Sequence, residues 1–382
     1  MITVLSVFGT RPEAIKMAPV LRELARRPDE IRSVVCVTAQ HRELLDQALA
    51  LFDIRPDHDL NAMAPGQSLA ELAARILAGL DPLIRSTGPD WVVAQGDTTT
   101  VLAAALAARH ARVRFAHVEA GLRTGDLSNP YPEEMNRRVA DGLADLCFAP
   151  TRRARANLLA EGVAPERVLV TGNTGIDALL WVAELPAGDP SKPGAGPGPL
   201  AALPSDRRIV TVTAHRRESF GEPLREICLA VADLAGEFSA RGFHFAIPMH
   251  LNPAARGPVG ELLSGVPGTS LLEPLGYADA VRLLKRSALV LTDSGGIQEE
   301  APALGKPVLV LRDVTERPEG VEAGAVRLAG RTRSGIREAA RRLLLDPGEL
   351  AAMAVPRFPY GDGRSAGRIV GALLGRMEPW EP

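Results

Sequence analysis

The chain has 382 residues, 46% of them hydrophobic, and a formal net charge of −2. This length and composition suit two domains with large apolar cores, and the near-neutral charge excludes recruitment of nucleic acid by a general basic field. Its three cysteines lack metal-binding or redox spacing and its histidines form no HxxxH or HExxH pattern, which predicts a reduced, cytoplasmic protein without a metal site. We expect no signal peptide, because the N-terminus has no basic region or cleavage site, and no membrane span, because no apolar run is long enough.

Short apolar runs alternate with longer amphipathic segments almost throughout the chain. The first half has predicted strands at 2–8, 33–38, 91–95, 113–118, 146–149 and 167–171, with helices such as 13–27, 68–85 and 99–110. The second half has predicted strands at 208–213, 243–248, 269–272, 288–292 and 307–311, with helices near 223–241, 278–286, 296–304 and 334–345. This alternation predicts α/β domains whose parallel sheets are covered by helices on both faces.

A segment rich in proline and glycine separates the two series of elements. Residues 186–206 contain this segment, which cannot form a helix or a central strand, and we interpret them as a linker. The prediction is therefore two doubly wound, Rossmann-like domains at 1–185 and 207–360 that face a cleft. Ligands of such sheets bind beyond the carboxyl ends of the strands, so the expected site is this cleft.

The turn after the first predicted strand combines a helix start with two cations. Thr10 and Glu13 form a capping-box pattern, and Arg11 and Lys16 lie in or near the first helical turn. Positive charge there opposes the helix dipole, so an anion shared by the two side chains would account for them. The alternative is a pair of solvated side chains on a surface helix.

Three carboxylates follow the next strands of the first half. Asp97 comes after strand 91–95, where it could also cap the next helix. Glu119 comes directly after strand 113–118 and shares a face with His117 if the alternation continues, although an ion pair with Arg123 would also explain it. Glu133 opens a later helix and is weaker as a candidate by itself.

The second half combines cations with a glycine-rich helix start. Strand 288–292 is followed by Ser294, Gly295 and Gly296, where unpaired N–H groups and the positive helix end suit a phosphate. Glu300 lies about one and a half turns later, where its carboxylate could accept hydrogen bonds from a sugar diol. The alternative interpretation is an ordinary serine cap. Further candidates at strand ends are His215 with Arg216, His250 and Arg317.

Taken together, these strings resemble the non-hydrolysing UDP-N-acetylglucosamine 2-epimerases. The matching strings occur in order along nearly the whole chain, at 8–16, 96–100, 117–124, 132–137, 215–218, 293–300 and 315–318. The resemblance implies the glycosyltransferase-B-like fold, with a C-terminal helix within 364–382 that completes the first domain. It also implies a cytoplasmic homodimer that uses neither a cofactor nor a metal and serves the synthesis of surface polysaccharides.

The family pattern also assigns roles to individual residues. It implies catalytic roles for Asp97, Glu119, Glu133 and His215. The implied substrate-binding residues are Arg11, Lys16, Arg137, Arg216, His250, Tyr277, Ser294, Gly295, Gly296, Glu300 and Arg317. A candidate allosteric site for the substrate includes Gln40 and His41.

The implied reaction interconverts UDP-GlcNAc and UDP-ManNAc through loss of UDP to give 2-acetamidoglucal, followed by re-addition. It needs a base on one face of the sugar, an acid on the other, and cations near the leaving diphosphate. The sequence leaves open which carboxylate serves which face. A hydrolysing epimerase, a glycosyltransferase of the same fold and a nucleotide-sugar-binding module without turnover are the alternatives.

Overall fold

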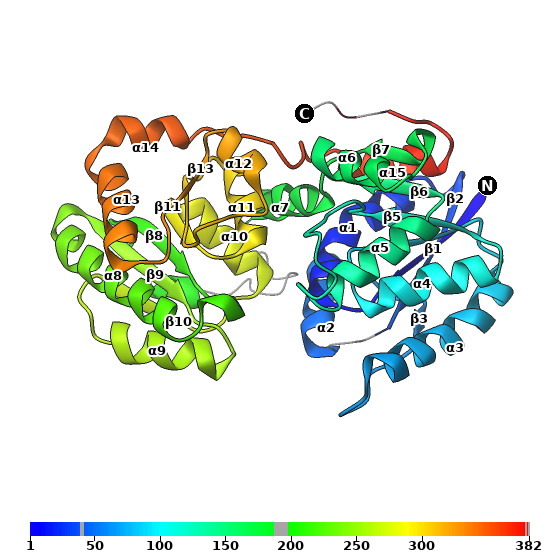
Figure 1. Ribbon diagram of the computed structural model, residues 1–382, viewed down its shortest axis with the longest axis horizontal. Coiled ribbons are helices and arrows are strands. Elements are labelled where there is room, and N and C mark those ends of the chain that lie inside the picture. The colour runs from blue at the N-terminus through cyan, green and yellow to red at the C-terminus, as the bar shows by residue number, and fades with distance from the viewer. Residues whose placement is uncertain (39–41, 187–197, 379, 381–382) are drawn as a thin grey trace. The chain divides into compact units, whose positions relative to one another are not determined.

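A computed structural model describes residues 1–38, 42–186, 198–378 and 380 of the chain. The chain divides into two compact units, which are described separately (Figure 1). Unit 1 comprises Met1–Ala178 with Tyr360–Pro382, and unit 2 comprises Leu179–Pro359. Most of the predicted linker, namely residues 187–197, lies outside the described residues.

Unit 1 contains a parallel sheet of seven strands in the order β3-β2-β1-β4-β5-β6-β7. The strands are β1 Ile2–Phe8, β2 Ile31–Val37, β3 His58–Asp59, β4 Trp91–Gln95, β5 Arg114–Val118, β6 Leu146–Ala149 and β7 Val168–Val170. The helices are α1 Arg11–Ala25, α2 Arg42–Leu51, α3 Leu69–Thr87, α4 Thr99–His110, α5 Glu133–Leu143, α6 Arg152–Ala160, α7 Thr174–Glu184 and α15 Ser365–Leu373, with a 3-10 turn η1 at Pro165–Arg167. The chain passes into unit 2 within α7 and returns to unit 1 before α15, which packs against α1.

Unit 2 contains a second parallel sheet, with six strands in the order β10-β9-β8-β11-β12-β13. The strands are β8 Arg208–Thr213, β9 Phe243–Pro248, β10 Thr269–Leu272, β11 Ser287–Thr292, β12 Val308–Val310 and β13 Val326–Leu328. The helices are α8 Glu222–Phe238, α9 Pro253–Leu263, α10 Tyr277–Arg286, α11 Gly295–Ala303, α12 Pro318–Glu322, α13 Arg333–Leu345 and α14 Pro347–Met353, with 3-10 turns η2 Pro199–Ala202, η3 Arg217–Ser219 and η4 Ser239–Arg241.

The predicted fold class of two Rossmann-like α/β domains is confirmed. Strand β1 is buried on both faces, as expected of a central parallel strand; Leu5 and Val7 belong to the apolar cluster that includes α3 and α4, and α1 packs on the same strand. The sequence patterns missed β3 and β13, because these strands have two and three residues and no long apolar run. Among the described residues, no helix has the combined length and apolar character that crossing a membrane requires.

Each sheet has one point at which the strand order reverses direction. In unit 1, β1 lies between β2 and β4; in unit 2, β8 lies between β9 and β11. The carboxyl ends of the two strands beside such a switch point diverge into helices on opposite faces, which leaves a crevice for ligands. The chain around residues 9–11 and 96–98 therefore marks the expected binding edge of unit 1, and residues 214–216 and 293–296 mark that of unit 2.

Candidate functional site

The switch point of unit 1 is fixed by hydrogen bonds at the start of α1. Thr10 is the N-cap of this helix and forms the predicted capping box with Glu13. The buried Glu13 carboxylate also accepts a hydrogen bond from Thr98 Oγ at 2.5 Å, so it joins the start of α1 to the loop between β4 and α4. Arg11, the first residue of α1, lies at the same edge, and burial lowers the pKa of its guanidinium.

Glu119 is bound by side chains from two neighbouring elements. Lys16 Nζ, on α1, lies 2.7 Å and 2.5 Å from its two carboxylate oxygens. Gln95, the last residue of β4, donates a hydrogen bond to the same carboxylate. The Glu119 side chain is only 7% exposed. The structure thus brings together two predicted site residues, one anionic and one cationic, and adds Gln95, which the sequence patterns did not indicate.

Two expectations about the surroundings of Glu119 are wrong. Strand β5 ends at Val118, and Glu119 has a φ of 68°, a left-handed conformation that costs a non-glycine residue about 1–2 kcal/mol. The alternation therefore stops before Glu119, and this residue does not share a strand face with His117. Arg123, the alternative partner of Glu119, forms ion pairs with Asp141 and Glu161, each at 2.7 Å.

His117 forms a buried network that sequence analysis missed. Its Nδ1 lies 2.6 Å from Asp141 Oδ1, and its Nε2 lies 2.6 Å from the carbonyl oxygen of Gly96. Because an ionised carboxylate and a carbonyl oxygen only accept hydrogen bonds, both ring nitrogens donate, and the ring is an imidazolium. Burial lowers the pKa of His117, but Asp141 and the two hydrogen bonds outweigh it and hold the pKa above its usual value. The network fixes the backbone immediately before Asp97.

Helix α5 supplies further contacts to the loop that carries Asp97. Asn136 Nδ2 donates to the Asp97 carbonyl oxygen at 2.9 Å, and Arg137 lies 3.2 Å from the Asp97 carboxylate. Thr98 is the N-cap of α4, so the alternative role of Asp97 as this cap is wrong. Glu133, the first residue of α5, has a buried carboxylate oxygen (Oε2) without a hydrogen-bond partner in the described structure. Such an unsatisfied buried oxygen is rare in folded proteins and marks Glu133 as a candidate for a functional role.

Unit 2 carries its own polar residues at its switch point. His215 follows β8 and Asp293 follows β11; the Asp293 carboxylate accepts hydrogen bonds from the backbone N–H groups of His215 and Arg216, both at 2.9 Å. His250, after β9, stacks on His215 with ring centroids 5.0 Å apart and an interplanar angle of 3°. Burial lowers the pKa of His215 and outweighs the opposite effect of Asp293. The structure therefore brings His215, Arg216 and His250 together beside Asp293 at one edge of unit 2.

The start of α11 differs in two ways from an ordinary capped helix. Ser294 is the N-cap, but its side chain makes no capping hydrogen bond, so the alternative interpretation as a simple serine cap is wrong. A Cβ atom on Gly295 would lie 3.1 Å from Arg317 Cζ, whereas one on Gly296 would meet only Ser294 Oγ at 4.0 Å. Gly295 thus makes room for Arg317, which also donates to Glu299 at 2.8 Å, and Gly296 leaves the helix start open.

Two other predicted binding residues of unit 2 contact each other. The hydroxyl group of Tyr277, the first residue of α10, donates to Glu300 Oε1 on α11 at 3.1 Å. Burial and the nearby Glu300 carboxylate raise the pKa of Tyr277 well above its usual value, so the phenol remains protonated and donates. The contact orients the Glu300 carboxylate on α11.

Comparison with known proteins identifies the family of the chain. Residues 22–374 match the model of the family described as UDP-N-acetylglucosamine 2-epimerase. The UDP-N-acetylglucosamine 2-epimerase of Escherichia coli (strain K12) is 51% identical over 370 residues, which cover 97% of this chain and 98% of that protein. The chain belongs to the UDP-N-acetylglucosamine 2-epimerase family.

Solved structures agree with this family membership. The crystal structure of UDP-GlcNAc 2-epimerase from Neisseria meningitidis bound to UDP-GlcNAc has 47% sequence identity and a TM-score of 0.88, with 98% of this chain and all of that chain covered. The glycosyltransferase SnogD from Streptomyces nogalater has 18% identity and a TM-score of 0.56 over 97% of this chain and 99% of that one. The second likeness concerns the fold alone and supports the glycosyltransferase-B-like class.

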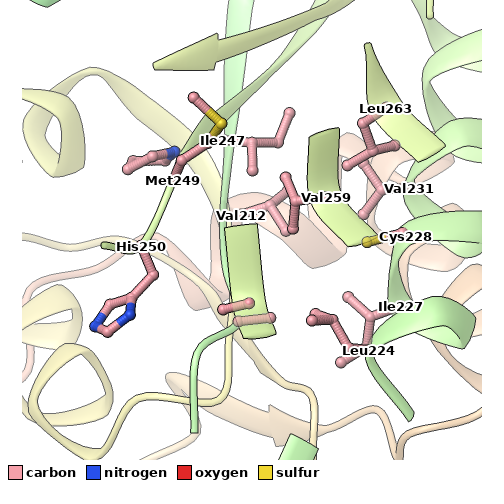
Figure 2. A pocket seen from close by; sticks show the side chains of 13 residues that line it. Val212, Leu224, Ile227, Cys228, Val231, Ile247, Met249, His250, Val259 and Leu263 are labelled. Carbon is pink, nitrogen blue, oxygen red and sulfur yellow. The ribbon is translucent and has the colours of Figure 1, made fainter. Parts of the chain in front are cut away.

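This UDP-N-acetylglucosamine 2-epimerase family member also has an apolar cavity in unit 2. Figure 2 shows the side chains that line it, among them Val212, Cys228, Met249 and Val259, with His250 at one side. The cavity volume of about 10 Å³ is enough for roughly one water molecule. It is therefore a packing defect between α8, α9 and the sheet, and it is too small for a nucleotide sugar.

Two points of the sequence analysis remain, namely the candidate allosteric residues and metal binding. Gln40 and His41, the candidate allosteric residues of this epimerase family member, lie outside the described residues. Within the described parts of the chain, no three residues among histidine, cysteine, aspartate and glutamate are grouped so that they could hold a metal ion.

Proposed function

We propose that this protein interconverts UDP-N-acetylglucosamine and UDP-N-acetylmannosamine by eliminating UDP and adding it back, without hydrolysis. Family membership and the relative bound to UDP-GlcNAc support this substrate. The observation that carries the mechanism is the partly buried Lys16–Glu119 pair at the switch point of unit 1. Inversion at C2 requires a base for the C2 hydrogen, and a carboxylate held at the binding edge can serve as that base.

The chemistry explains why acidic side chains are needed at this site. The C2 hydrogen is not next to a carbonyl group, so its removal alone is too difficult. In UDP-GlcNAc the C2–H and C1–O bonds are both axial and anti to each other. A base takes the C2 proton, the C–H electron pair forms the C1–C2 double bond of 2-acetamidoglucal, and UDP leaves with the C1–O electron pair. UDP then returns to C1, and a proton reaches the other face of C2.

We assign the proton transfers to carboxylates of unit 1. Glu119 is paired with Lys16, and Asp97 is held by α5 through its carbonyl oxygen and its carboxylate. Glu133 offers a third carboxylate, with an oxygen that has no hydrogen-bond partner in the described structure. Three acids on rigid supports allow a base on one face of the sugar and an acid on the other. Arg11, with Lys16, supplies positive charge at the same edge.

We assign the binding of UDP to unit 2. The first turn of α11, from Ser294 to Gly296, offers N–H groups to a phosphate, and Arg317 packs beside it. His215, Arg216 and His250 lie at the adjacent strand ends and add donors for the diphosphate. Glu300, oriented by Tyr277, suits the two hydroxyl groups of the ribose.

One NMR experiment tests this function. UDP-GlcNAc is incubated with the protein in D₂O, and the products and their isotope content are followed with time. We expect UDP-ManNAc to appear and deuterium to enter at C2, with no free ManNAc. Free ManNAc together with UDP would show a hydrolysing epimerase, and UDP binding without exchange at C2 would show a binding module. The homodimer, the cytoplasmic location and the role in polysaccharide synthesis stay predictions.

A further inference from the structure

Only one of the two oxygens of the Asp293 carboxylate accepts hydrogen bonds from the described residues. It is fully buried, and its Oδ2 accepts three hydrogen bonds, from the N–H groups of His215 and Arg216 at 2.9 Å each and from Ser219 Oγ at 2.8 Å. Its Oδ1 is buried and has no hydrogen-bond partner in the described structure. His215 Nδ1 lies 3.9 Å from this oxygen, which is beyond hydrogen-bond distance. A buried carboxylate oxygen normally has a hydrogen-bond partner, so the lack of one at Oδ1 requires an explanation.

A backbone hydrogen bond defines the tautomer of the neighbouring His250. The backbone N–H of Asn252 donates to His250 Nδ1 at 3.1 Å, so this nitrogen carries no proton and the ring proton lies on Nε2. The ring of His250 stacks on that of His215. Two stacked imidazolium rings would repel each other, whereas a neutral His250 tolerates one positive charge on His215.

The surroundings of His215 lower its pKa and so favour the neutral ring. The groups that face it are Asp293 at the end of β11, His250 beyond β9 and Arg216 in its own loop. Burial lowers the pKa of His215 most; Asp293 raises it, and Arg216 lowers it further, so that it stays below the usual value. An anion placed beside the ring would reverse this balance, because an opposite charge favours the protonated form.

We propose that His215 takes up one proton from solvent when the diphosphate of a UDP-sugar binds, and that Asp293 balances the new charge. A small movement of the His215 ring shortens the 3.9 Å between Nδ1 and Asp293 Oδ1 to a hydrogen-bond distance, so that Nδ1–H donates to this oxygen. The added proton lies on Nε2, from which it is donated to a phosphate oxygen. Asp293 is then a positioning residue, and its unsatisfied oxygen is reserved for the ligand-bound state.

This inference rests on the proposed function, namely that unit 2 binds UDP. It adds a prediction that the family and the fold do not make: binding of UDP is linked to uptake of a proton. Because the ring is neutral before binding and charged afterwards, the linkage is largest at a pH above the pKa of free His215 and below that of the complex.

Calorimetry of UDP binding at pH 7.5, in two buffers with different ionisation enthalpies, measures the protons taken up. We expect more than half a proton in the wild-type protein. His215→Gln is expected to bind UDP more weakly and to take up almost none. Asp293→Asn keeps an oxygen for the three accepted bonds and removes the charge, so uptake is expected to fall by at least half. His244→Gln is the matched control, since His244 lies on β9 and bonds to Ser270 instead; it should retain the wild-type uptake.

The outcomes separate the inference from the proposed function. If the wild-type protein does not bind UDP, the assignment of unit 2 as the UDP site is wrong. If UDP binds without proton uptake, or His215→Gln keeps the wild-type uptake, the inference is overturned. Should Asp293→Asn fail to fold, ¹⁵N NMR of the wild-type histidine rings decides the matter. His215 must change from one to two protonated nitrogens on addition of UDP, and an unchanged ring also overturns the inference.

Discussion

Replacing Glu119 by glutamine removes a charge and keeps almost the same shape. The wild-type carboxylate is 7% exposed and lies 2.5 Å and 2.7 Å from Lys16 Nζ, and Gln95 donates to it as well. A hydrogen bond to a charged group contributes about 1.5–3 kcal/mol. Because Lys16 is 26% exposed, water can solvate it after the change, so we expect a loss of only about 1–2 kcal/mol in stability. The variant should therefore remain folded.

Catalysis is expected to respond far more strongly than stability. A positioned group that transfers a proton contributes about 10²–10⁴-fold to the rate, which corresponds to about 3–5 kcal/mol of the barrier at about 1.36 kcal/mol per factor of ten. We expect deuterium incorporation at C2 of UDP-GlcNAc, followed by ¹H NMR in D₂O, to slow by at least about 10²-fold. The affinity for UDP, measured by calorimetry, should change by less than about threefold, because Glu119 belongs to unit 1.

Glu23→Gln is the matched control for this experiment. Glu23 also contacts cations near α1, with Arg27 at 2.9 Å and Arg26 at 3.3 Å, but these pairs lie at the other end of the helix. This variant should exchange deuterium at the wild-type rate. The reasoning is refuted if Glu119→Gln also exchanges at the wild-type rate, or if both variants slow equally, since the loss would then reflect a general change of charge.

Three further predictions follow from buried groups. His117→Gln should cost about 3–5 kcal/mol of stability near pH 6 in urea unfolding, and less near pH 9. A raised pKa of His117 stabilises the fold at low pH, and this contribution is lost as the pH rises through the pKa of the folded state. An equal cost at both pH values would contradict the assignment of His117 as an imidazolium. Gly295→Ala, whose added Cβ would press on Arg317, should have a lower melting temperature than Gly296→Ala, whose added Cβ would meet only Ser294 Oγ at 4.0 Å; equal thermal scans would argue against this packing role. Burial raises the pKa of Asp177 to about 6, so the folded state loses stability as the pH rises from the pKa of the unfolded chain through 6. Asp177→Asn should therefore raise the free energy of unfolding by about 2–3 kcal/mol at pH 8 and by almost nothing near pH 4. A destabilised variant at pH 8 would oppose this interpretation.

Local patterns in the sequence were sufficient to predict the two sheets and the residues at their edges. Apolar runs identified the central strands because a parallel strand is buried on both faces, and the capping box of Thr10 and Glu13 located the start of α1. The strand ends then indicated Lys16, Asp97, Glu119, His215 and the Ser294 turn, since ligands of doubly wound sheets bind there.

The partners of these residues depended on the tertiary structure, because they come from distant parts of the chain. Glu119 pairs with Lys16, 103 residues away, and not with the nearby Arg123. His117 bonds to Asp141, 24 residues away, in a contact for which the sequence has no local signal.

The sequence by itself thus determined which strands and helix starts exist, since hydrophobic periodicity and capping act over a few neighbouring residues. The tertiary structure decided which charges meet, which oxygen of Asp293 has no partner among the described residues, and which glycine makes room for a side chain. Those properties depend on the register of the strands and on the packing of helices from separate segments. The physical reason is that burial and nearby charges decide the protonation of a group, and both are absent until the chain has folded.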